Sequence, residues 1–497
     1  MAMTKQKLEF GSWEPDAAIY QGMQACEACN VLPMKRGYRP MASLAYDDFI
    51  EAAPGRVLAA LSAKFVPDEV STIIATHDGI YSLENKKWVR KYSGTAVNDN
   101  RQLCLYGSDV YCIFGRTLVR ATTDASIVGN FTAVSGAPAG ELLCVVQDFL
   151  VIGRTRDNEA GIHWSAIDDP TTWPAVGSDD AQFKQSDVQI FPEGGKVQAI
   201  VGGLSAGITG LVFLERGVQL MTYTGSPYIF QFSPLERSRG LLSSKSPVVA
   251  GGFCIYLSED GWRITDGSSV KSIGDERVDR WFFSRCASDR LTDVVGVHDI
   301  NNRVIWWAFA SQGCADDVYD SVLIYNYAQD RWAWGKMAIE FMFSDFARGI
   351  SLDDLDRYKD AQGRPNIDAL PFTSLDVPSL KPGQAVLGGF TADHRLGAFQ
   401  GKNLEAIVTT SEIGGDRMMV HGLRPIVDCG NAQAAPIYRS REMDLQKVGK
   451  LTKQQRDGVC YQHVSTVYLS AQVVIPAGIV WNSVVGVEAL VEPEGGM

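Results

Sequence analysis

Apolar residues gather into short runs separated by polar turn residues, and many of these runs come in pairs along the chain. The stretch STIIATHDGIYSLENKKWVRKYS places Asp78 and Gly79 between two such runs. Asp-Gly suits the positive φ angles that two-residue hairpin turns require, so we expect a β-hairpin here. Seven further stretches have this form, with turns at 107–109, 147–148, 216–217, 260–261, 301–302, 329–330 and 393–394.

The spacing of these turns predicts the architecture. Neighbouring turns lie mostly 28 to 44 residues apart, with two longer steps, close to the ~40 to 50 residues of a four-stranded propeller blade. No motif repeats from unit to unit, so the blades are expected to be diverged or irregular. The best helix candidate is 275–291, where Val278, Trp281, Phe282 and Cys286 are spaced for one face. We therefore predict a mainly β protein, an irregular β-propeller with few short helices.

Turn spacing and local composition divide the chain after residue 55 into three regions. Residues 56–350 carry most of the hairpins and are expected to form the propeller core. Residues 351–383 are rich in aspartate and proline, which predicts a loop-rich excursion or linker. Residues 384–497 predict the final blade strands and a C-terminal β segment or small β domain. The pattern leaves open whether the last hundred residues form a separate domain or close the propeller.

Charge limits the classes of function. The chain has 46 basic and 58 acidic residues, which gives a net charge of −12. No basic run forms a stripe that could neutralise phosphates, so sequence-specific DNA recognition is not expected. No run approaches the ~18 apolar residues of a membrane-spanning helix, and the N-terminal stretch lacks the apolar core of a signal peptide. We expect no membrane span, and synthesis in a cytoplasm.

Motifs for metal, cofactor or catalysis are weak. Cys26 and Cys29 have metal-ligand spacing, but no second pair and no His-x3-His motif completes a zinc site. The glycine-rich stretch at 202–210 precedes a predicted strand pair, whereas a phosphate site needs a helix there. No Gly-x-Ser-x-Gly elbow is present. We therefore expect no metal, no cofactor and no enzymatic activity.

The stretch HWSAIDDPTTWP gives the main alternative. Asp168 and Asp169 could serve a propeller glycosidase, which requires carboxyl groups about 5 to 9.5 Å apart across a sugar cleft. Adjacent aspartates point in different directions, and Asp-Pro followed by two threonines is typical of a turn. We expect that Asp169 and Pro170 fix a turn, and that Trp164 and Trp173 anchor it to the blade core.

Several blocks, in matching order along the chain, resemble the tail nozzle or tail hub proteins of short-tailed phages, also called packaged-DNA stabilization proteins. The stretch NVLPMKRGYRPM resembles the Asn-Val-x-Pro…Gly-Tyr-x-Pro segment near their N-terminus. This match carries over Asn30, Gly37, Tyr38, Arg39 and Pro40 as structural or interface residues. Residues 1–55 are accordingly expected to form an N-terminal arm and interface segment.

Further blocks extend the resemblance over most of the chain. IHWSAIDDPTTWPAVGSDDAQF is similar to the family's Ser-x-x-Asp-Pro-x-x-Trp segment, which carries over Ser165, Asp169, Pro170 and Trp173. DGIYSLENKKWVRKYSG resembles its first blade, LVFLERGVQLMTYTG its central blades, and VVIPAGIVWNSVVGVEALVEPEGG its end. QHVSTVYLS stands where the family has a basic sequence, so contacts made by those basic residues are not carried over.

The resemblance implies a structural role in the virion. It implies a homo-oligomeric ring, by analogy a hexamer, that lies beneath the portal and adaptor rings, retains packaged DNA and conducts it during ejection. The implied partners are the head–tail adaptor, tail fibre, spike or needle proteins, and double-stranded DNA in non-specific passage. An acidic chain suits a conduit because it repels phosphates. The alternatives are a propeller glycosidase or depolymerase acting on host surface glycan, and a non-viral propeller scaffold.

Overall fold

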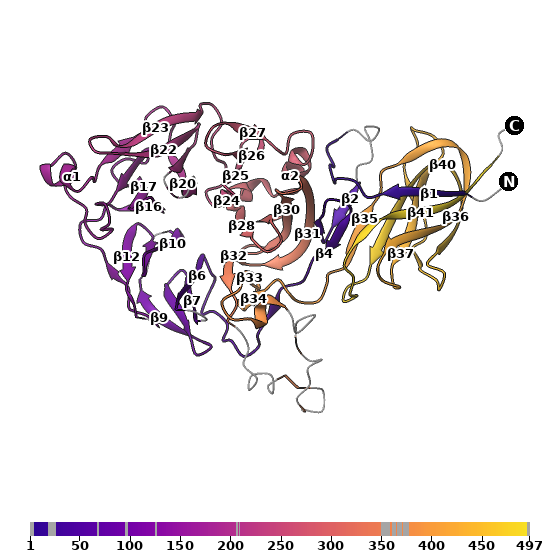
Figure 1. Cartoon of the computed structure of the whole chain (residues 1–497), viewed down its shortest axis with the longest axis horizontal. Helices are drawn as coiled ribbons and strands as arrows, with labels where there is room; N and C mark the ends of the chain where they lie inside the picture. Colours follow the sequence, from indigo (N-terminus) through magenta and orange to yellow (C-terminus); the bar gives the residue numbers. More distant parts are fainter. Residues whose placement is uncertain are drawn as a thin grey trace.

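A computed structural model gives the fold of the chain (Figure 1). It describes all residues except 1–3, 18–25, 67–68, 95–97, 125–126, 205–206, 208, 349–357, 360–363, 365–369, 371–376 and 495–497. Strands dominate the described residues, which contain only two α-helices, α1 (Asp179–Phe183) and α2 (Asp279–Arg285). The predicted mainly β fold with few short helices is confirmed.

Four-stranded antiparallel units follow one another along the chain and form the propeller. The first consists of β6 (Ala59–Val66), β7 (Glu69–Ala75), β8 (Gly79–Glu84) and β9 (Lys87–Ser93). The second consists of β10 (Arg101–Tyr106), β11 (Asp109–Phe114), β12 (Thr117–Ala121) and β15 (Thr132–Ala133), with a small hairpin of β13 (Thr123–Asp124) and β14 (Ile127–Val128) inserted. The third consists of β16 (Gly140–Val146), β17 (Phe149–Thr155), β18 (Gly161–Trp164) and β19 (Val188–Ile190).

The next units have the same form. The fourth consists of β20 (Val197–Leu204), β21 (Thr209–Leu214), β22 (Val218–Gly225) and β23 (Ile229–Glu236). The fifth consists of β24 (Val248–Ala250), β25 (Phe253–Ser258), β26 (Gly261–Thr265) and β27 (Val270–Ser272). The sixth consists of β28 (Val295–Asp299), β29 (Val304–Phe309), β30 (Tyr319–Asn326) and β31 (Arg331–Ile339).

The last unit combines distant segments. It consists of β32 (Phe341–Phe346), β33 (Ala385–Phe390), β34 (Leu396–Ala398) and β5 (Ala45–Tyr46). The first strands β6, β10, β16, β20, β24, β28 and β32 contact one another in this order, and β32 contacts β6. These contacts close the propeller. Six of its units are separate four-stranded sheets, and one further unit, β28–β31, belongs to a larger sheet.

All eight predicted hairpins are present. Their strand pairs are β7–β8, β10–β11, β16–β17, β21–β22, β25–β26, β28–β29, β30–β31 and β33–β34. The predicted helix at 275–291 is shorter, because α2 ends at Arg285 and the 3-10 turn η2 (Ser288–Asp293) follows. Val278, Phe282 and Cys286 are buried together, as their spacing predicts.

The larger sheet holds 15 strands and joins the propeller to the C-terminal region. Its order along the main path is β28-β29-β30-β31-β2-β35-β40-β36-β41-β4-β3. The C-terminal strands are β35 (Ala406–Thr409), β36 (Ile413–Val427), β37 (Gln433–Arg439), β38 (Lys447–Val448), β39 (Thr452–Lys453), β40 (Cys460–Ile475) and β41 (Val484–Pro493). They lie beside the propeller at the other end of the long axis (Figure 1).

The N-terminal segment pairs with strands of both parts. Its strands are β1 (Thr4–Glu9), β2 (Glu27–Cys29), β3 (Val31–Pro33) and β4 (Tyr38–Pro40), followed by β5. β1 and β4 pair with β41, β2 lies between β31 and β35, and β5 completes the last propeller unit. Of the predicted excursion at 351–383, most residues lie outside the described part, which includes the short 3-10 turn η4 (Pro378–Leu380).

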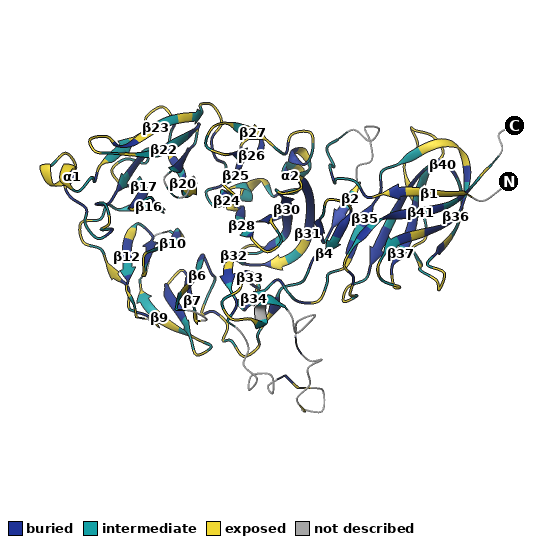
Figure 2. Cartoon of the chain, viewed as in Figure 1, coloured by how far each residue is buried: buried dark blue, intermediate teal, exposed yellow. Residues whose placement is uncertain are grey.

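One hydrophobic core continues from the propeller into the C-terminal strands. It includes Trp262 and Trp307 of the propeller and Val420 and Val487 of the C-terminal strands. Dark blue, buried strand segments run through both parts in Figure 2. The two parts are therefore packed together through a shared core.

Candidate functional site

The predicted interface segment lies at the joint between the propeller and the C-terminal strands. Asn30 occupies the left-handed region at a φ of 57°. Its amide Nδ2 donates to the Glu405 carbonyl at 2.9 Å, and its Oδ1 accepts from the Lys336 backbone N–H at 2.8 Å. Its own backbone N–H donates to the Trp334 carbonyl at 2.8 Å. Asn30 thus ties the N-terminal segment to β31 and to the chain before β35.

Gly37 and the residues after it pack against β41 and the propeller. Gly37 has a φ of +74°, and a Cβ there would lie 2.1 Å from the Val484 carbonyl oxygen, so only glycine fits. Tyr38 is fully buried and donates from its hydroxyl to the Gly11 carbonyl at 2.8 Å; burial raises the pKa of this hydroxyl to about 12. Arg39 donates to the Asn302 carbonyl at 3.2 Å, and burial lowers its pKa.

Pro40 pairs with Val31 at the end of the β3–β4 hairpin. The structure therefore brings Asn30, Gly37, Tyr38 and Pro40 together as an internal joint. Their use as contacts between subunits stays a prediction. Within one subunit, Tyr38 has no surface left to offer a partner, because its side chain is fully buried.

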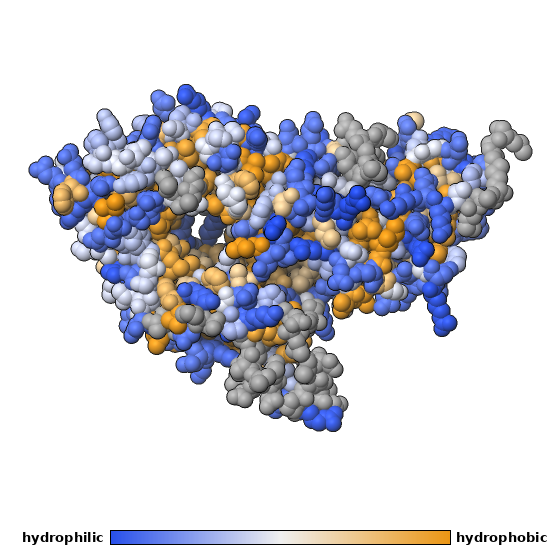
Figure 3. Space-filling model, viewed as in Figure 1, coloured by the Kyte–Doolittle hydropathy of each residue, from blue (hydrophilic) through white to orange (hydrophobic). Residues whose placement is uncertain are grey.

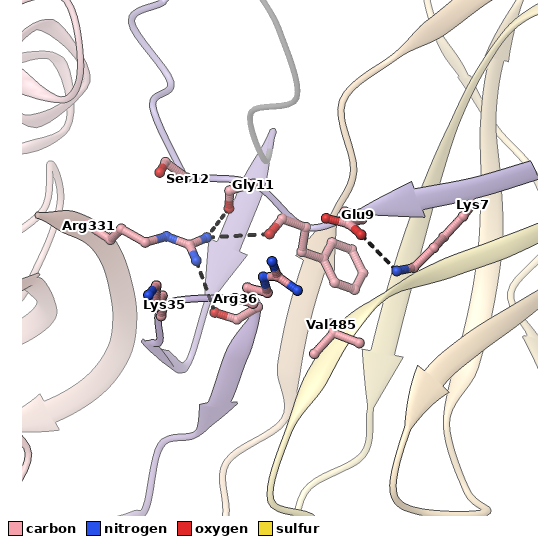
Figure 4. A pocket seen from close by; sticks show the side chains of 10 residues that line it. Lys7, Glu9, Gly11, Ser12, Lys35, Arg36, Arg331 and Val485 are labelled. Carbon is pink, nitrogen blue, oxygen red and sulfur yellow. Dashed lines mark hydrogen bonds and ion pairs between the residues drawn. The ribbon is translucent and has the colours of Figure 1, made fainter. Parts of the chain in front are cut away.

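Arg331 is a residue of this joint that sequence reasoning missed. Its side chain is buried at the start of β31, with 6% of its surface exposed. The guanidinium donates to the Gly11 carbonyl (Figure 4), to the Phe10 carbonyl and to the Met34 carbonyl at 2.6 Å, and it lies 5.0 Å from the Tyr38 ring. The available signal was an arginine directly before the apolar residues WAW, where a charge that is buried needs hydrogen-bond acceptors.

A pocket of about 380 Å³ opens beside this arginine. Its charged lining residues are Lys7, Glu9, Lys35, Arg36 and Arg331 (Figure 4). Lys7 and Glu9 form an ion pair at 2.7 Å, and the hydrogen bond from Lys7 lowers the pKa of Glu9. The remaining three charges are cations, so the pocket is locally positive on an acidic chain. Such a lining favours contact with an anionic group.

The Asp-Pro turn of the third unit has the predicted geometry. Asp169 Oδ1 accepts from the Thr171 backbone N–H at 3.0 Å and from its hydroxyl at 2.6 Å, and Oδ2 accepts from the Thr172 hydroxyl at 2.5 Å. Burial raises the pKa of Asp169, but these hydrogen bonds outweigh it and lower the pKa overall. A general acid of a glycosidase needs a raised pKa, so Asp169 is suited to hold a turn.

The two tryptophans anchor this turn in two different cores. Trp164 donates from Nε1 to the Gln185 carbonyl at 3.0 Å and packs edge to face on Phe230 of the fourth unit, with ring centroids 5.2 Å apart. Trp173 donates to the Pro170 carbonyl at 3.1 Å and is buried with Tyr111 of the second unit. The turn therefore connects its own blade to both neighbouring blades.

The centre of the propeller holds an open hollow of about 460 Å³, lined by the first strands of the units and visible in Figure 3. Two cations line it. Arg101 is buried, and its guanidinium donates to four backbone carbonyls. Lys245 donates to the Leu58 carbonyl at 3.1 Å; burial, with a smaller effect of Arg56, lowers its pKa to about 8. The hollow otherwise presents mostly apolar side chains.

The possible metal ligands, the Cys26–Cys29 pair and the helices are arranged as follows. Within the described residues, no group of three or more His, Cys, Asp or Glu side chains is placed to hold a metal ion. Cys26 and Cys29 are free thiols, and burial raises the pKa of Cys29 to about 12. Among the helices of the described part, none has the length and apolar character needed to cross a membrane.

Comparisons with known proteins give structural neighbours only. No protein-family model and no curated protein matches the chain. A solved BBS1N–ARL6DN complex is similar over 73% of this chain and 97% of that one, with 10% identity and a TM-score of 0.41. A Lactobacillus plantarum protein covers 55% of this chain and 81% of its own, with 11% identity and a TM-score of 0.35. The AfRom2 CNH domain covers 59% and 89%, with 9% identity and a TM-score of 0.37. The propeller assignment rests on the strand pairings of this chain.

Proposed function

We propose that this protein is a non-enzymatic structural subunit of a phage tail, a ring-forming nozzle or hub protein. In this role it extends the portal–adaptor channel, retains packaged DNA and conducts it during ejection. The observation that carries the proposal is the ordered set of sequence blocks that resemble the tail nozzle family, from NVLPMKRGYRPM to VVIPAGIVWNSVVGVEALVEPEGG. None of the three solved structures named above is described as a phage protein.

The continuous construction of the subunit supports this proposal. The 15-stranded sheet, the shared core and the N-terminal strands join the propeller to the C-terminal strands at several points. A subunit that bears load between two rings needs such continuity, because a flexible linker would let its two ends move independently. The net charge of −12 also suits a conduit, since an acidic wall binds phosphates poorly.

Purified protein should test the proposal by electron microscopy. We expect closed rings with an axial channel, alone or with a head–tail adaptor ring, and we expect the protein in purified phage particles. By analogy with the family the ring is a hexamer, in contact with fibre, spike or needle proteins in the virion. A protein that stays monomeric in all of these preparations and is missing from virions would contradict the proposal. A non-viral propeller scaffold would likewise form no ring and would be missing from virions.

A further inference from the structure

The pocket beside Arg331, which we call the cationic pocket, is formed by segments that are distant in the sequence. The end of β1 and the residues after it, the turn between β3 and β4, Arg331 of β31 and Val485 of β41 line it (Figure 4). Its volume of about 380 Å³ lies within the range of about 300 to 1,000 Å³ that is usual for sites of small molecules. A ligand bound there would link all of these segments.

Arg331 brings to this pocket a buried positive charge that has no negative partner. Its side chain is 6% exposed, and its Nε has no hydrogen-bond partner among the described residues. The other guanidinium nitrogens donate to neutral backbone carbonyls, those of Phe10, Gly11, Met34 and Gly37. The nearby carboxylates Glu14 and Asp330 both pair with Arg277, at 3.2 and 2.7 Å. A buried charge is costly unless an opposite charge compensates it, so an anion in the pocket would stabilise Arg331.

The turn between β3 and β4 adds two exposed cations, Lys35 and Arg36. Neither side chain forms an ion pair within the described part of the chain. The turn that carries them is held in place, because the Met34 backbone N–H donates to the Gly37 carbonyl at 3.1 Å and Gly37 packs closely on Val484 of β41. Cations on a fixed turn lose less conformational freedom when a ligand binds, which favours binding.

The carboxylates around the pocket do not cancel its positive charge. Among the described lining residues Glu9 is the one acidic residue, and it pairs with Lys7 at 2.7 Å. Arg36 makes a smaller contribution than Lys7 to the lowered pKa of Glu9. Glu488 lies opposite Lys7 in the pairing of β1 with β41, and it is 3.7 Å from Arg424. The lining thus has four cations and one carboxylate, a net charge of +3.

We propose that the cationic pocket binds a small phosphate compound, either inorganic phosphate or a phosphate monoester. Such a group carries a charge of about −1.5 to −2 at neutral pH, which matches Lys35, Arg36 and Arg331 better than the single charge of a carboxylate. Guanidinium and ammonium groups both form charge-assisted hydrogen bonds to phosphate oxygens. The inference is independent of the proposed ring function, because the site lies within one subunit.

Isothermal titration calorimetry with inorganic phosphate tests the site, with the ionic strength held constant by sodium chloride. We expect the wild type to bind with a dissociation constant of about 1 mM or lower. The variant K35Q/R36Q should bind about tenfold or more weakly, because two charged contacts are lost. Thermal unfolding gives an independent readout. Phosphate should raise the melting temperature of the wild type more than that of K35Q/R36Q, since a ligand that binds the folded state stabilises it.

Matched variants separate the site from general effects of charge. K87Q/K271Q neutralises two exposed lysines elsewhere on the propeller and should bind phosphate as the wild type does. Lys35 and Arg36 are exposed, so K35Q/R36Q should have the circular dichroism spectrum of the wild type. Arg331 is left unchanged, because its contacts with backbone carbonyls hold the joint.

Each contrary outcome overturns a defined part of the proposal. If the wild type shows neither heat of binding nor a higher melting temperature at about 10 mM phosphate, the pocket is not a phosphate site. If K35Q/R36Q binds phosphate as tightly as the wild type, phosphate binds elsewhere. Equal affinity for acetate would show that the pocket does not select a doubly charged anion. If these two residues are needed only for binding of duplex DNA without terminal phosphates, the ligand is a phosphodiester backbone. Ring formation is measured separately by electron microscopy, so each of these results leaves the proposed function standing.

Discussion

The fourth propeller unit and the joint are built in opposite ways. β20 to β23 follow one another within 40 residues, and each pairs with the next through a short turn. At the joint, β2 lies between β31 and β35, and β4 pairs with β41, so partners lie hundreds of residues apart. Blades therefore depend on local turn chemistry, whereas the joint depends on contacts that exist only once both ends of the chain have folded.

Removal of a large ring should have the greatest effect, and Trp173→Ala tests it within the blades. Trp173 is 9% exposed and packs between the second and third units, so its truncation should lower the free energy of unfolding by about 3 to 5 kcal/mol. Chemical denaturation measures this loss. Trp173→Phe keeps a ring in the same core and should cost clearly less. A fully stable Trp173→Ala protein would show that this turn is not anchored as proposed.

Two glycines in left-handed conformations compare the joint with a blade directly. Gly37→Ala places a Cβ against the Val484 carbonyl and should cost about 2 to 4 kcal/mol, from backbone strain and overpacking. Gly107 has a φ of +60° in a hairpin turn with nothing near its Cβ, so Gly107→Ala should cost only about 1 to 2 kcal/mol. Thermal unfolding of both variants checks the difference. Equal losses of stability would mean that the backbone at Gly37 and Val484 moves apart to accept the Cβ without a cost in free energy.

Asp279, the first residue of α2, makes the stability of the protein depend on pH. Burial raises the pKa of this carboxyl to about 7, and nearby Asp16 adds to the increase. Between about pH 4 and pH 7 the folded protein keeps a proton that the unfolded chain has lost, so stability falls as pH rises through this range. Asp279→Asn stays neutral and keeps an acceptor for the Trp262 backbone N–H. At pH 8 it should be more stable than the wild type by about 1 to 3 kcal/mol.

Denaturation curves at pH 5 and pH 8 measure this effect, and Asp279→Ala serves as the second variant. It leaves the Trp262 N–H without its acceptor and should therefore be less stable than Asp279→Asn at both pH values. If the wild type and Asp279→Asn show the same pH dependence, Asp279 does not titrate in this range.

The smallest expected effect compares two helix caps. Ser178 caps α1 from the adjacent position, accepting from the Ala181 backbone N–H at 3.1 Å. Asp16 caps α2 from the N-terminal segment, accepting from the Arg280 and Trp281 backbone N–H groups at 2.6 and 2.9 Å. Each change to alanine should cost about 0.5 to 2 kcal/mol. Hydrogen exchange should show that Asp16→Ala also loosens the N-terminal segment, whereas Ser178→Ala affects only α1.

Sequence reasoning found the blades because their turns lie next to the strands they join. It also found the Asp169 turn, since Asp-Pro-Thr-Thr forms its hydrogen bonds within four residues. It assigned Tyr38 and its neighbours as structural or interface residues, and it did not show that Tyr38 is fully buried between the propeller and the C-terminal strands. The cationic pocket was also missed, because Lys7, Lys35 and Arg331 meet only in three dimensions.

The sequence by itself determined the mainly β class, the eight hairpins and the role of Trp164 and Trp173, because turn preferences and apolar alternation act over a few residues. Only the tertiary structure decided that β5 completes the last propeller unit, that Asp16 caps α2 and that Arg331 holds the joint. Each of these contacts joins distant segments, and its free energy depends on side chains at both ends. No local pattern in either segment specifies its partner.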